Sequence, residues 1–324
     1  MTGLVVDEVF AEEAPVRPTS SPTGPDRIFR ALATAAGMVS LVIVATTFVF
    51  LVNQSRPALR KAGIKHFFTD SLWNPGAGRI GVWGLLVGTI IIGTIAMVLA
   101  IPLALGMALF INEFAPAWLK RPLTSMMDLL AAMPSLLFGI WGLRSLQGQL
   151  TPISHWLADH LSVIYFFRLS NSDVTLASSS FMAGVVVAFM IVPIVTSVSR
   201  DVMAQVPREQ CEGALALGGT RWGMIREVIL PFGRSGIVGA ALLGFGRALG
   251  ETIAVAMLIS LVFKANPHVL ELGAGSIAAL IATRFAEADE FERSGLVAAG
   301  LALFLLTLVV NLGARRIVAR TKVA

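Results

Sequence analysis

The sequence predicts an all-α integral membrane protein that crosses the membrane with six helices. Composition is the first observation: 56% of the residues are hydrophobic and 14% are charged, whereas soluble domains carry about 25% charged residues. The second is a pair of runs, residues 31–52 and 80–111, that contain no charged residue. Each run is long enough to cross a hydrocarbon core of about 30 Å, which takes roughly 20 helical residues.

The N-terminal region combines a polar tail with the first expected span. Residues 1–26 are acidic, rich in proline and poor in large apolar side chains, so we predict a disordered cytoplasmic tail. An acidic tail followed by a long apolar run is not typical of a cleaved signal peptide. We therefore expect residues 27–79 to supply a permanent membrane helix, over residues 31–52, and an extracytoplasmic connection.

Five further apolar stretches complete the expected fold. Their expected bounds, in chain order, are residues 81–111, 123–143, 181–198, 235–263 and 294–312. Pro102 is expected to kink the second span, since neighbouring helices can accommodate proline in a membrane helix. Residues 80–316 would form the core, with a cytoplasmic loop at residues 200–234 and an outer loop at residues 144–180, and residues 317–324 would form a basic tail.

The distribution of Lys and Arg gives the expected orientation. With the N-terminus inside, the segments that face the cytoplasm carry modestly more Lys and Arg than the outer segments, as the positive-inside rule requires. The basic cluster of Arg315, Arg316, Arg320 and Lys322 favours the same orientation. Six spans then predict that both termini, and the loop at residues 200–234, lie in the cytoplasm.

The most informative segment is a polar stretch between two apolar blocks, EGALALGGTRWGMIREVILP at residues 212–231. It predicts a short helix that ends at Gly218 and Gly219, a second helical start capped by Thr220, and a stop at Pro231. The physical reasons are local, because glycine tolerates the left-handed conformation that ends helices, Thr caps helix starts, and proline disrupts a helix.

This segment resembles the cytoplasmic EAA loop of ABC importer permeases, which reads Glu-Ala-Ala, three residues, Gly, nine residues and Ile-x-Leu-Pro. The matching residues here are Glu212, Ala214, Gly218, Leu230 and Pro231. Gly213 replaces the residue at the second position of the pattern, and Val228 replaces its Ile. In that family the loop docks into an ATPase subunit. The resemblance therefore implies that these residues couple the chain to a cytoplasmic ATPase.

Two charged residues stand deep within the fifth expected span. Arg247 and Glu251 are four residues apart, so on one helix they would share a face and could form an ion pair. An ionised residue at such depth costs about 2.5–3.5 kcal/mol on insertion scales and tends to face a cavity or a partner. We expect a polar wall of a solute path, and the alternative is a structural ion pair. Asp128 in the third span leaves both roles open, because it is closer to the cytoplasmic interface.

Other signals of chemistry are weak. None of the lysines follows a glycine, so the chain holds no P-loop of its own and no cofactor site is expected in it. His66, His155, His160 and His268 lack metal-ligand spacing. The net charge of +5 comes from basic residues that flank apolar segments, so nucleic acid is not an expected partner. With Cys211 as the single cysteine, an intrachain disulfide is impossible.

Three short motifs narrow the resemblance. AMPS at residues 132–135, GIWG at residues 139–142 and GRALGET at residues 246–252 occur in the order seen in phosphate-specific ABC importer permeases of the PstC type. The similarity covers roughly residues 28–316. Met133, where the family is expected to carry a branched aliphatic residue, and the long acidic tail depart from the pattern.

That resemblance implies a type I importer permease core that forms a phosphate path with a second, homologous permease subunit. It also implies two copies of a cytoplasmic ATPase, which bind the ATP, an extracytoplasmic phosphate-binding protein, and the lipid of a prokaryotic cytoplasmic membrane. The matching motifs would place Arg247, Glu251, Thr252 and Ser135 along the path. The chain itself would be a transport subunit and not an enzyme.

Other functions remain open from the sequence. The EAA-like loop alone also fits a permease for sulfate, molybdate or an amino acid, and GRALGET is the motif that discriminates. An ion-coupled secondary transporter would use intramembrane acids such as Glu251, but the inverted repeats expected in many such folds are not visible. A membrane scaffold without transport would leave Arg247 and Glu251 at depth without a purpose.

Overall fold

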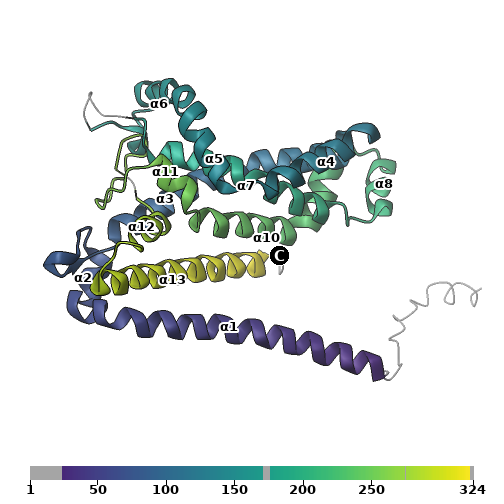
Figure 1. Ribbon diagram of the computed structural model, residues 1–324. Coiled ribbons are helices and arrows are strands. Elements are labelled where there is room, and N and C mark those ends of the chain that lie inside the picture. The colour runs from purple at the N-terminus through teal and green to yellow at the C-terminus, as the bar shows by residue number, and fades with distance from the viewer. Residues whose placement is uncertain (1–23, 171–175, 274, 322–324) are drawn as a thin grey trace, which may run out of the picture. The chain divides into compact units, whose positions relative to one another are not determined.

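The computed structural model describes residues 24–170, 176–273 and 275–321, and its regular structure is almost entirely helical (Figure 1). It divides into two compact units, Met1–Phe50 and Leu51–Ala324. The expected disordered tail lies outside the described residues as far as residue 23. The short elements of the second unit are α2 (Ile64–Thr69), the antiparallel strands β1 (Trp73–Asn74) and β2 (Arg79–Ile80), α12 (Ile277–Arg284), and the 3-10 turns Pro75–Ala77 and Tyr165–Phe167.

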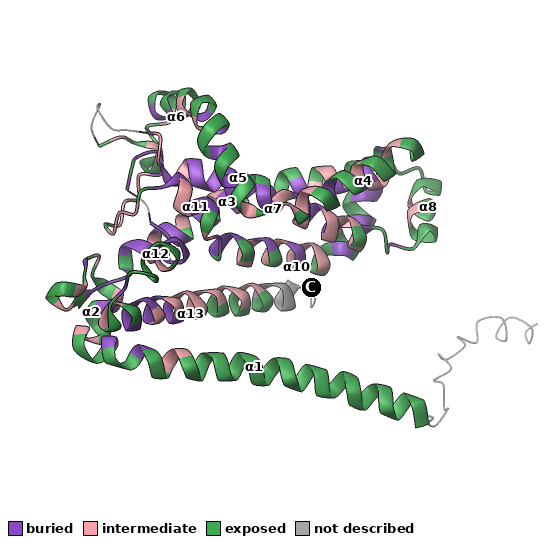
Figure 2. Cartoon of the chain, viewed as in Figure 1, coloured by how far each residue is buried: buried purple, intermediate pink, exposed green. Residues whose placement is uncertain are grey.

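The first unit consists of the beginning of α1 (Gly24–Ala62), which is longer than the expected span at both ends. Every residue from 24 to 50 is exposed (Figure 2). An apolar helix that exposes its whole circumference is suited to contact with lipid. Its backbone N–H and C=O groups bond to one another within the helix, so they need no polar partner outside it.

The end of α1 belongs to the second unit and is joined there to α13 (Glu290–Thr321). Pro57 lies inside the helix and cannot donate a backbone hydrogen bond. One residue further on, the hydroxyl of Ser294 accepts from the N–H of Ala58, at 3.2 Å, and donates to the carbonyl of Gln54, at 2.8 Å. The Ser294 hydroxyl thus stands between the two groups that would bond directly in a regular helix.

The centre of the second unit is the packing of α3 (Trp83–Leu109) against α7 (Ser180–Met203). A π-helical turn, Phe110–Phe114, extends α3. The buried face of α3 repeats a small residue at every fourth position: Ala96, Ala100, Ala104 and Ala108. Residues with this spacing lie on one face, and small side chains allow two membrane helices to approach closely.

Five helices of the described residues are long and apolar enough to cross a membrane, and six if one bent pair is counted as a single span. The five are Gly24–Ala62, Trp83–Phe114, Ser180–Met203, Arg221–Leu249 and Glu290–Arg316. Helix α13 continues to Thr321 through most of the expected basic tail, and residues 322–324 lie outside the described part. The predicted all-α membrane fold is confirmed, and its third span is the bent pair.

The third expected span, residues 123–143, is interrupted. Helix α4 (Ala117–Ala132) ends before Pro134, and the helical run that begins with α5 (Ser135–Trp141) leaves it at an angle of 92°. The cause is Pro134, which disfavours the helical conformation of the preceding residue, and Met133 accordingly has a ψ of 137°. A π-helical turn, Gly142–Leu146, joins α5 to α6 (Gln147–His160), so much of the expected outer loop is helical.

The fifth expected span, residues 235–263, is wrong beyond residue 249. Helix α10 (Leu230–Leu249) ends at Gly250, and a short helix, α11 (Ile253–Leu258), follows after a break. The apolar composition of residues 253–263 misled the prediction, because it is equally suited to a short buried helix and to the continuation of a span. The described residues that follow, 259–273 and 275–276, are mostly irregular.

The expected stop at Pro231 is also wrong. Helix α9 (Arg221–Met224), a π-helical turn at Ile225–Ile229 and α10 form one continuous helical run through this proline. In the π turn the N–H of Leu230 bonds to the carbonyl of Ile225, five residues back. This wider turn accommodates a proline, which lacks an N–H and would crowd the carbonyl of a regular helical turn.

The segment at residues 259–276 is tied to the chain that follows α6. The N–H of Val269 donates to the carbonyl of Phe166, at 2.9 Å. The carboxylate of Glu271 accepts hydrogen bonds from the backbone N–H and hydroxyl of Ser170 and from the amide of Asn266. Burial raises the pKa of Glu271, but these hydrogen bonds and the nearby His268 outweigh burial, so its pKa lies below the ordinary value.

Candidate functional site

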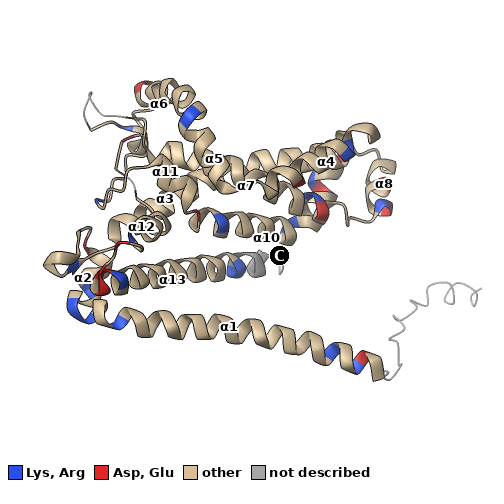
Figure 3. Cartoon of the chain, in the orientation of Figure 1, with Lys and Arg blue, Asp and Glu red and all other residues tan. Residues whose placement is uncertain are grey.

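The cytoplasmic loop predicted from the sequence forms a separate helical element at one end of the bundle. Helix α8 (Arg208–Ala216) lies at the end opposite α6 and α12 (Figure 1). Charged residues gather mainly at the ends of the helices, whereas the middles of α3, α7 and α13 are almost free of them (Figure 3). This distribution is what a bundle that crosses a hydrocarbon layer requires.

The turn after α8 follows the local chemistry that the sequence indicates. Gly218 has a φ of 84°, and its N–H donates to the carbonyl of Leu215 while the N–H of Gly219 reaches back to Ala214. A Cβ at Gly219 would lie 2.6 Å from the carbonyl oxygen of Ala214, so this position has no room for a side chain. The hydroxyl of Thr220 then accepts from the N–H of Gly223, at 3.1 Å, and caps α9.

One face of α8 anchors the helix and the opposite face is exposed. Cys211 and Ala214 pack against an apolar cluster formed by the ends of α3 and α7 and the start of α10, to which Leu230 also belongs. Glu212 and Gly213 are exposed, and a Cβ at Gly213 would meet open space. Large apolar side chains are exposed on the same element: Leu215 at 41%, Leu217 at 92% and Trp222 at 63%.

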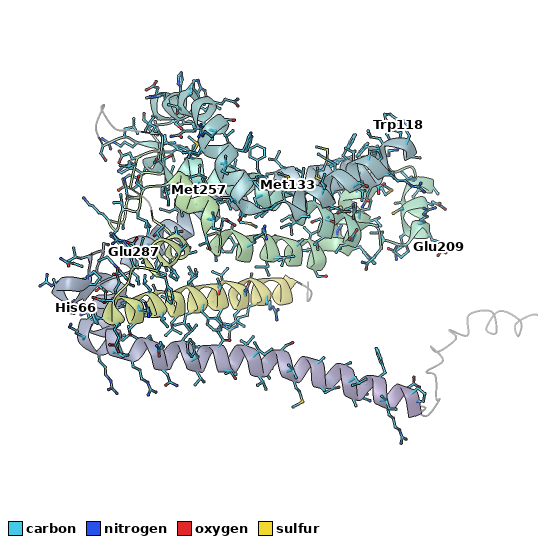
Figure 4. The ribbon with its side chains drawn as sticks, in the orientation of Figure 1. His66, Trp118, Met133, Glu209, Met257 and Glu287 are labelled. Atoms are coloured by element: carbon cyan, nitrogen blue, oxygen red, sulfur yellow. The ribbon has the colours of Figure 1, made fainter. Side chains whose placement is uncertain are left out.

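The two interrupted membrane helices meet inside the bundle. Helix α5 packs against α11, and a Cβ at Gly139 would lie 2.9 Å from the Cα of Ala254, so the glycine of the GIWG motif permits this close approach. Ser135 is the first residue of α5, and Thr252 immediately precedes α11. The break at Met133 lies midway along the bundle, between Glu209 on α8 and Glu287 beyond α12 (Figure 4).

Glu251 stabilises the second break. Its side chain is buried, at 7% exposure, and its Oε1 accepts from the N–H of Ala254, at 3.2 Å, as a cap of α11. The hydroxyl of Thr252 donates to the carbonyl of Gly250, at 2.9 Å. Both side chains of the GRALGET motif therefore satisfy backbone groups that the break leaves without helical partners.

The expected ion pair between Arg247 and Glu251 is wrong: among the described residues, no ion pair joins them. The reason is that α10 ends at Leu249, so the two residues do not lie on one helical face. Arg247 stands in the last turn of α10, where a cation is favoured by the helix dipole. Its side chain lines an open groove of about 970 Å³ between α7, α10 and α13.

The sequence analysis missed the other polar side chains of this groove. Ser235 on α10 and Asn311 and Arg315 on α13 line it together with Arg247. The signal was the spacing of Asn311 and Arg315, which are four residues apart and share a face of one helix. We had interpreted Arg315 only as part of the basic cluster that sets the orientation.

Asp128 lies in α4 and joins a hydrogen-bonded network with α7. The hydroxyl of Ser197 donates to its carboxylate, at 3.0 Å, and Arg200 on the same helix as Ser197 pairs with Asp201, at 2.8 Å. Asp128 thus connects α4 to α7 near the anchored face of α8. Among the described residues, no group of three or more His, Cys, Asp or Glu side chains is arranged to hold a metal ion.

The fold is a bundle of apolar helices with an open groove lined by Arg247 and an exposed helix, α8, at one end, and it is typical of a membrane-spanning protein. Known structures have the same fold. A chain of a bacterial ABC transporter involved in the import of the acidic polysaccharide alginate superimposes with a TM-score of 0.59 at 16% identity, over 91% of this chain and 97% of its own. A chain of the inward-facing MetNI methionine ABC transporter gives a TM-score of 0.50 at 17% identity, over 74% of this chain and 94% of its own.

Sequence comparison is more specific. Residues 100–323 match the family described as binding-protein-dependent transport system inner membrane component. Proteins named phosphate transport system permease protein PstC 2, from Mycobacterium bovis and Mycobacterium tuberculosis, are 40% identical over 90% of this chain and 91% of theirs. The PstC protein of Mycobacterium leprae is 38% identical over 93% of this chain and 98% of its own. The chain belongs to this family of inner membrane transport components.

Proposed function

We propose that the chain is the membrane-spanning permease subunit of an ATP-driven importer of inorganic phosphate, and that it forms the translocation path with a second, homologous permease subunit. The observation that carries the substrate is the similarity, over nine-tenths of the chain, to proteins named phosphate transport system permease. The groove beside Arg247 supports it, because a guanidinium binds phosphate oxygens through charge-assisted and often bidentate hydrogen bonds.

Coupling to ATP hydrolysis would take place at the exposed face of α8 and the turn that follows it. Leu215, Leu217 and Trp222 present apolar surface on an otherwise polar element, which is typical of a protein interface. We propose that two copies of a cytoplasmic ATPase bind ATP and that one of them docks here against Glu212 and Gly213. The other motif residues have supporting roles: Ala214 and Leu230 anchor the element to the bundle, Gly218 forms its turn, and Pro231 lies in the helical run that continues into α10.

Along the path, Arg247 would contact the anion directly. Ser135 and Thr252 lie at the two breaks, where a rigid-body movement of the bundle could open and close a passage. Glu251 would act as a positioning residue, since it caps α11 and holds the break next to Arg247.

The remaining partners follow from the same proposal. An extracytoplasmic phosphate-binding protein would deliver its cargo to the end of the bundle that carries α6 and α12, and lipid of the cytoplasmic membrane would surround the spans. The end with α8 would face the cytoplasm together with both termini, as the cluster at Arg315 and Arg316 favours. The chain itself would bind no cofactor.

The test is reconstitution of the chain with its permease partner, ATPase and binding protein in lipid vesicles. We expect ATP-dependent uptake of radiolabelled phosphate. Sulfate and molybdate, each tested without a binding protein of its own, should show no comparable uptake. Uptake of sulfate or molybdate in preference to phosphate would identify another importer of the same family. Uptake driven by an ion gradient without the ATPase would contradict the whole assignment.

A further inference from the structure

The groove beside Arg247 extends well beyond that residue. Its volume is about 970 Å³, and its polar side chains are Ser235, Arg247, Asn311 and Arg315. None of the described residues that line it is acidic. The groove therefore combines two guanidinium groups with an amide and a hydroxyl on otherwise apolar walls.

The floor of the groove is one face of α10. Ser235, Gly239, Leu243 and Arg247 follow one another at intervals of four residues, so they lie in a row along the helix. Twelve residue steps separate Ser235 from Arg247 and correspond to about 18 Å along the axis, at 1.5 Å per residue. Ser235 stands near the start of α10, next to the cytoplasmic element, and Arg247 near its end.

The glycines of α10 fall into two groups that differ in what surrounds them. A Cβ at Gly236 would lie 2.5 Å from Val202, and one at Gly244 would lie 2.6 Å from Val195, so these glycines let α10 pack against α7. A Cβ at Gly239 or Gly246 would meet no atom within 4 Å. Packing within the chain does not require the second pair, which instead leaves the floor of the groove open.

The wall on α13 supplies a second basic position. Asn311 and Arg315 are one turn apart and line the groove, whereas the adjacent Arg316 does not. A basic residue that only fixes orientation has no need to face a groove, and Arg316 already serves that purpose at the same depth. The side chains of Ser235, Asn311 and Arg315 all donate hydrogen bonds and so are suited to an anion.

We propose that Ser235, Asn311 and Arg315 form a second anion-binding station on the cytoplasmic side of Arg247, through which phosphate leaves the path. This proposal rests on the proposed function of phosphate import. Two stations suit transport better than one strong site, because a solute must bind well enough to enter and weakly enough to leave. The phosphate group of an anionic lipid has the same chemistry, so the test separates the two sources.

The first test compares matched variants of adjacent arginines. In the reconstituted importer we expect Arg315→Gln to lower phosphate uptake per assembled complex about tenfold or more, as loss of a hydrogen bond to a charged group does. Arg315→Lys keeps the charge without the planar fork and should fall between. Arg316→Gln removes the same charge one residue away and should leave uptake near the wild-type rate. Equal uptake by the two Gln variants would overturn the proposal.

The second test measures access directly and does not depend on uptake. With Cys211, the single cysteine, replaced by Ser, Asn311→Cys should react with an anionic methanethiosulfonate reagent added from the cytoplasmic side. Leu312→Cys, at a neighbouring exposed position that does not line the groove, should stay unreactive in lipid. We expect inorganic phosphate to slow the reaction at residue 311 and to lose this effect when Arg315→Gln is added.

Lipid composition separates the two sources of phosphate. In lipid vesicles of phosphatidylcholine alone, protection of residue 311 by inorganic phosphate should persist, and adding anionic lipid should not replace it. If anionic lipid slowed the reaction at residue 311 and inorganic phosphate did not, the proposed second anion-binding station would be contradicted. Phosphate uptake by the wild-type importer in the same preparation is the control. If the wild type takes up phosphate while Arg315→Gln and Arg316→Gln give equal uptake, the second station is contradicted and the proposed function stands. If wild-type complexes move no phosphate, the proposed function fails instead.

Discussion

Two bends of the chain, one after α8 and one in the membrane bundle, are built in different ways. At the first bend Gly218 has a φ of 84°, a left-handed conformation that costs other L-residues about 1–2 kcal/mol. At the second bend Gly250 has a φ of −91°, which any residue adopts. There the structure depends on side chains, because the Glu251 carboxylate caps α11 and the Thr252 hydroxyl bonds to the carbonyl of Gly250.

The surroundings explain this difference. The turn at Gly218 is exposed, so water can satisfy the backbone groups that its hydrogen bonds leave over. At the second bend Glu251 and the N–H of Ala254 are buried, so this backbone group must find its partner inside the protein. Glu251 thus supports the backbone that it caps, next to the basic groove through which we propose that phosphate passes.

The largest effect should come from removing the membrane cap. Glu251→Ala leaves the buried N–H of Ala254 without its acceptor, and an unsatisfied buried group costs about 1–3 kcal/mol. We expect a large loss of assembled complex and a lower unfolding temperature in detergent. Glu251→Gln keeps an acceptor oxygen and should be much milder. If the Ala variant matches the wild type in both measurements, the break does not depend on this side chain.

The next effect concerns the cytoplasmic element. Replacing Glu212 and Gly218 together by Ala should leave the chain in the membrane but greatly reduce ATP-dependent uptake, because the exposed face and the turn after α8 would both change. Glu227→Ala serves as the control, since Glu227 is also an exposed acid but occupies one of the nine unspecified positions between Gly218 and Val228. Normal uptake by the double variant would mean that the element is only a connector.

A direct comparison of the two bends uses the same substitution at each glycine. Gly218→Ala should destabilise by about 1–2 kcal/mol because of its positive φ. Gly250→Ala should be neutral or stabilise by up to about 1 kcal/mol, because a Cβ there meets its nearest atom at an ordinary 3.5 Å and alanine lowers the entropy of the unfolded chain. Unfolding midpoints of the two purified variants test this, and the reverse order would contradict the comparison.

The smallest effect should appear at the far end of the bundle. Because the pKa of Glu271 is lowered in the folded chain, its carboxylate stabilises the fold above its unfolded pKa, and this contribution is lost as the pH falls through the folded value. The hydrogen bonds from Ser170 and Asn266 and the nearby His268 are the causes of this lowered pKa. Glu271→Gln should therefore unfold at a slightly lower temperature at neutral pH, with the difference vanishing in acid. A constant difference down to pH 3 would show that ionisation is not involved.

The sequence predicts the first bend and not the second, because only the first is set by residues close together in the chain. Gly218 and Thr220 act on backbone groups within a few residues, so their pattern is visible locally, and the structure confirms both. The end of α10 at Gly250 depends on the packing of α11 against α5, through Gly139, which is distant in sequence. The apolar run at residues 253–263 therefore gave no sign that α10 ends at Leu249. The ion pair between Arg247 and Glu251 requires a continuous helix there, so it is absent for the same reason.

The groove shows the same limit. Arg247 stands out because a charge in an apolar stretch is rare, but its neighbours Asn311 and Arg315 come from a helix more than sixty residues away. The prediction that a helix stops at Pro231 is wrong for a different reason. A π-helical turn accommodates the proline, and no local sequence pattern indicates such a turn. The docking role of the EAA-like residues stays a prediction.

The most direct test of the account is phosphate uptake per assembled complex by Arg247→Gln. Loss of the guanidinium at the inner end of the groove should abolish or greatly slow uptake, while the chain still assembles with its partner permease and ATPase, because Arg247 is exposed and forms no ion pair with Glu251. Arg247→Lys should give an intermediate rate. Normal uptake per complex by the Gln variant would contradict the path proposed here.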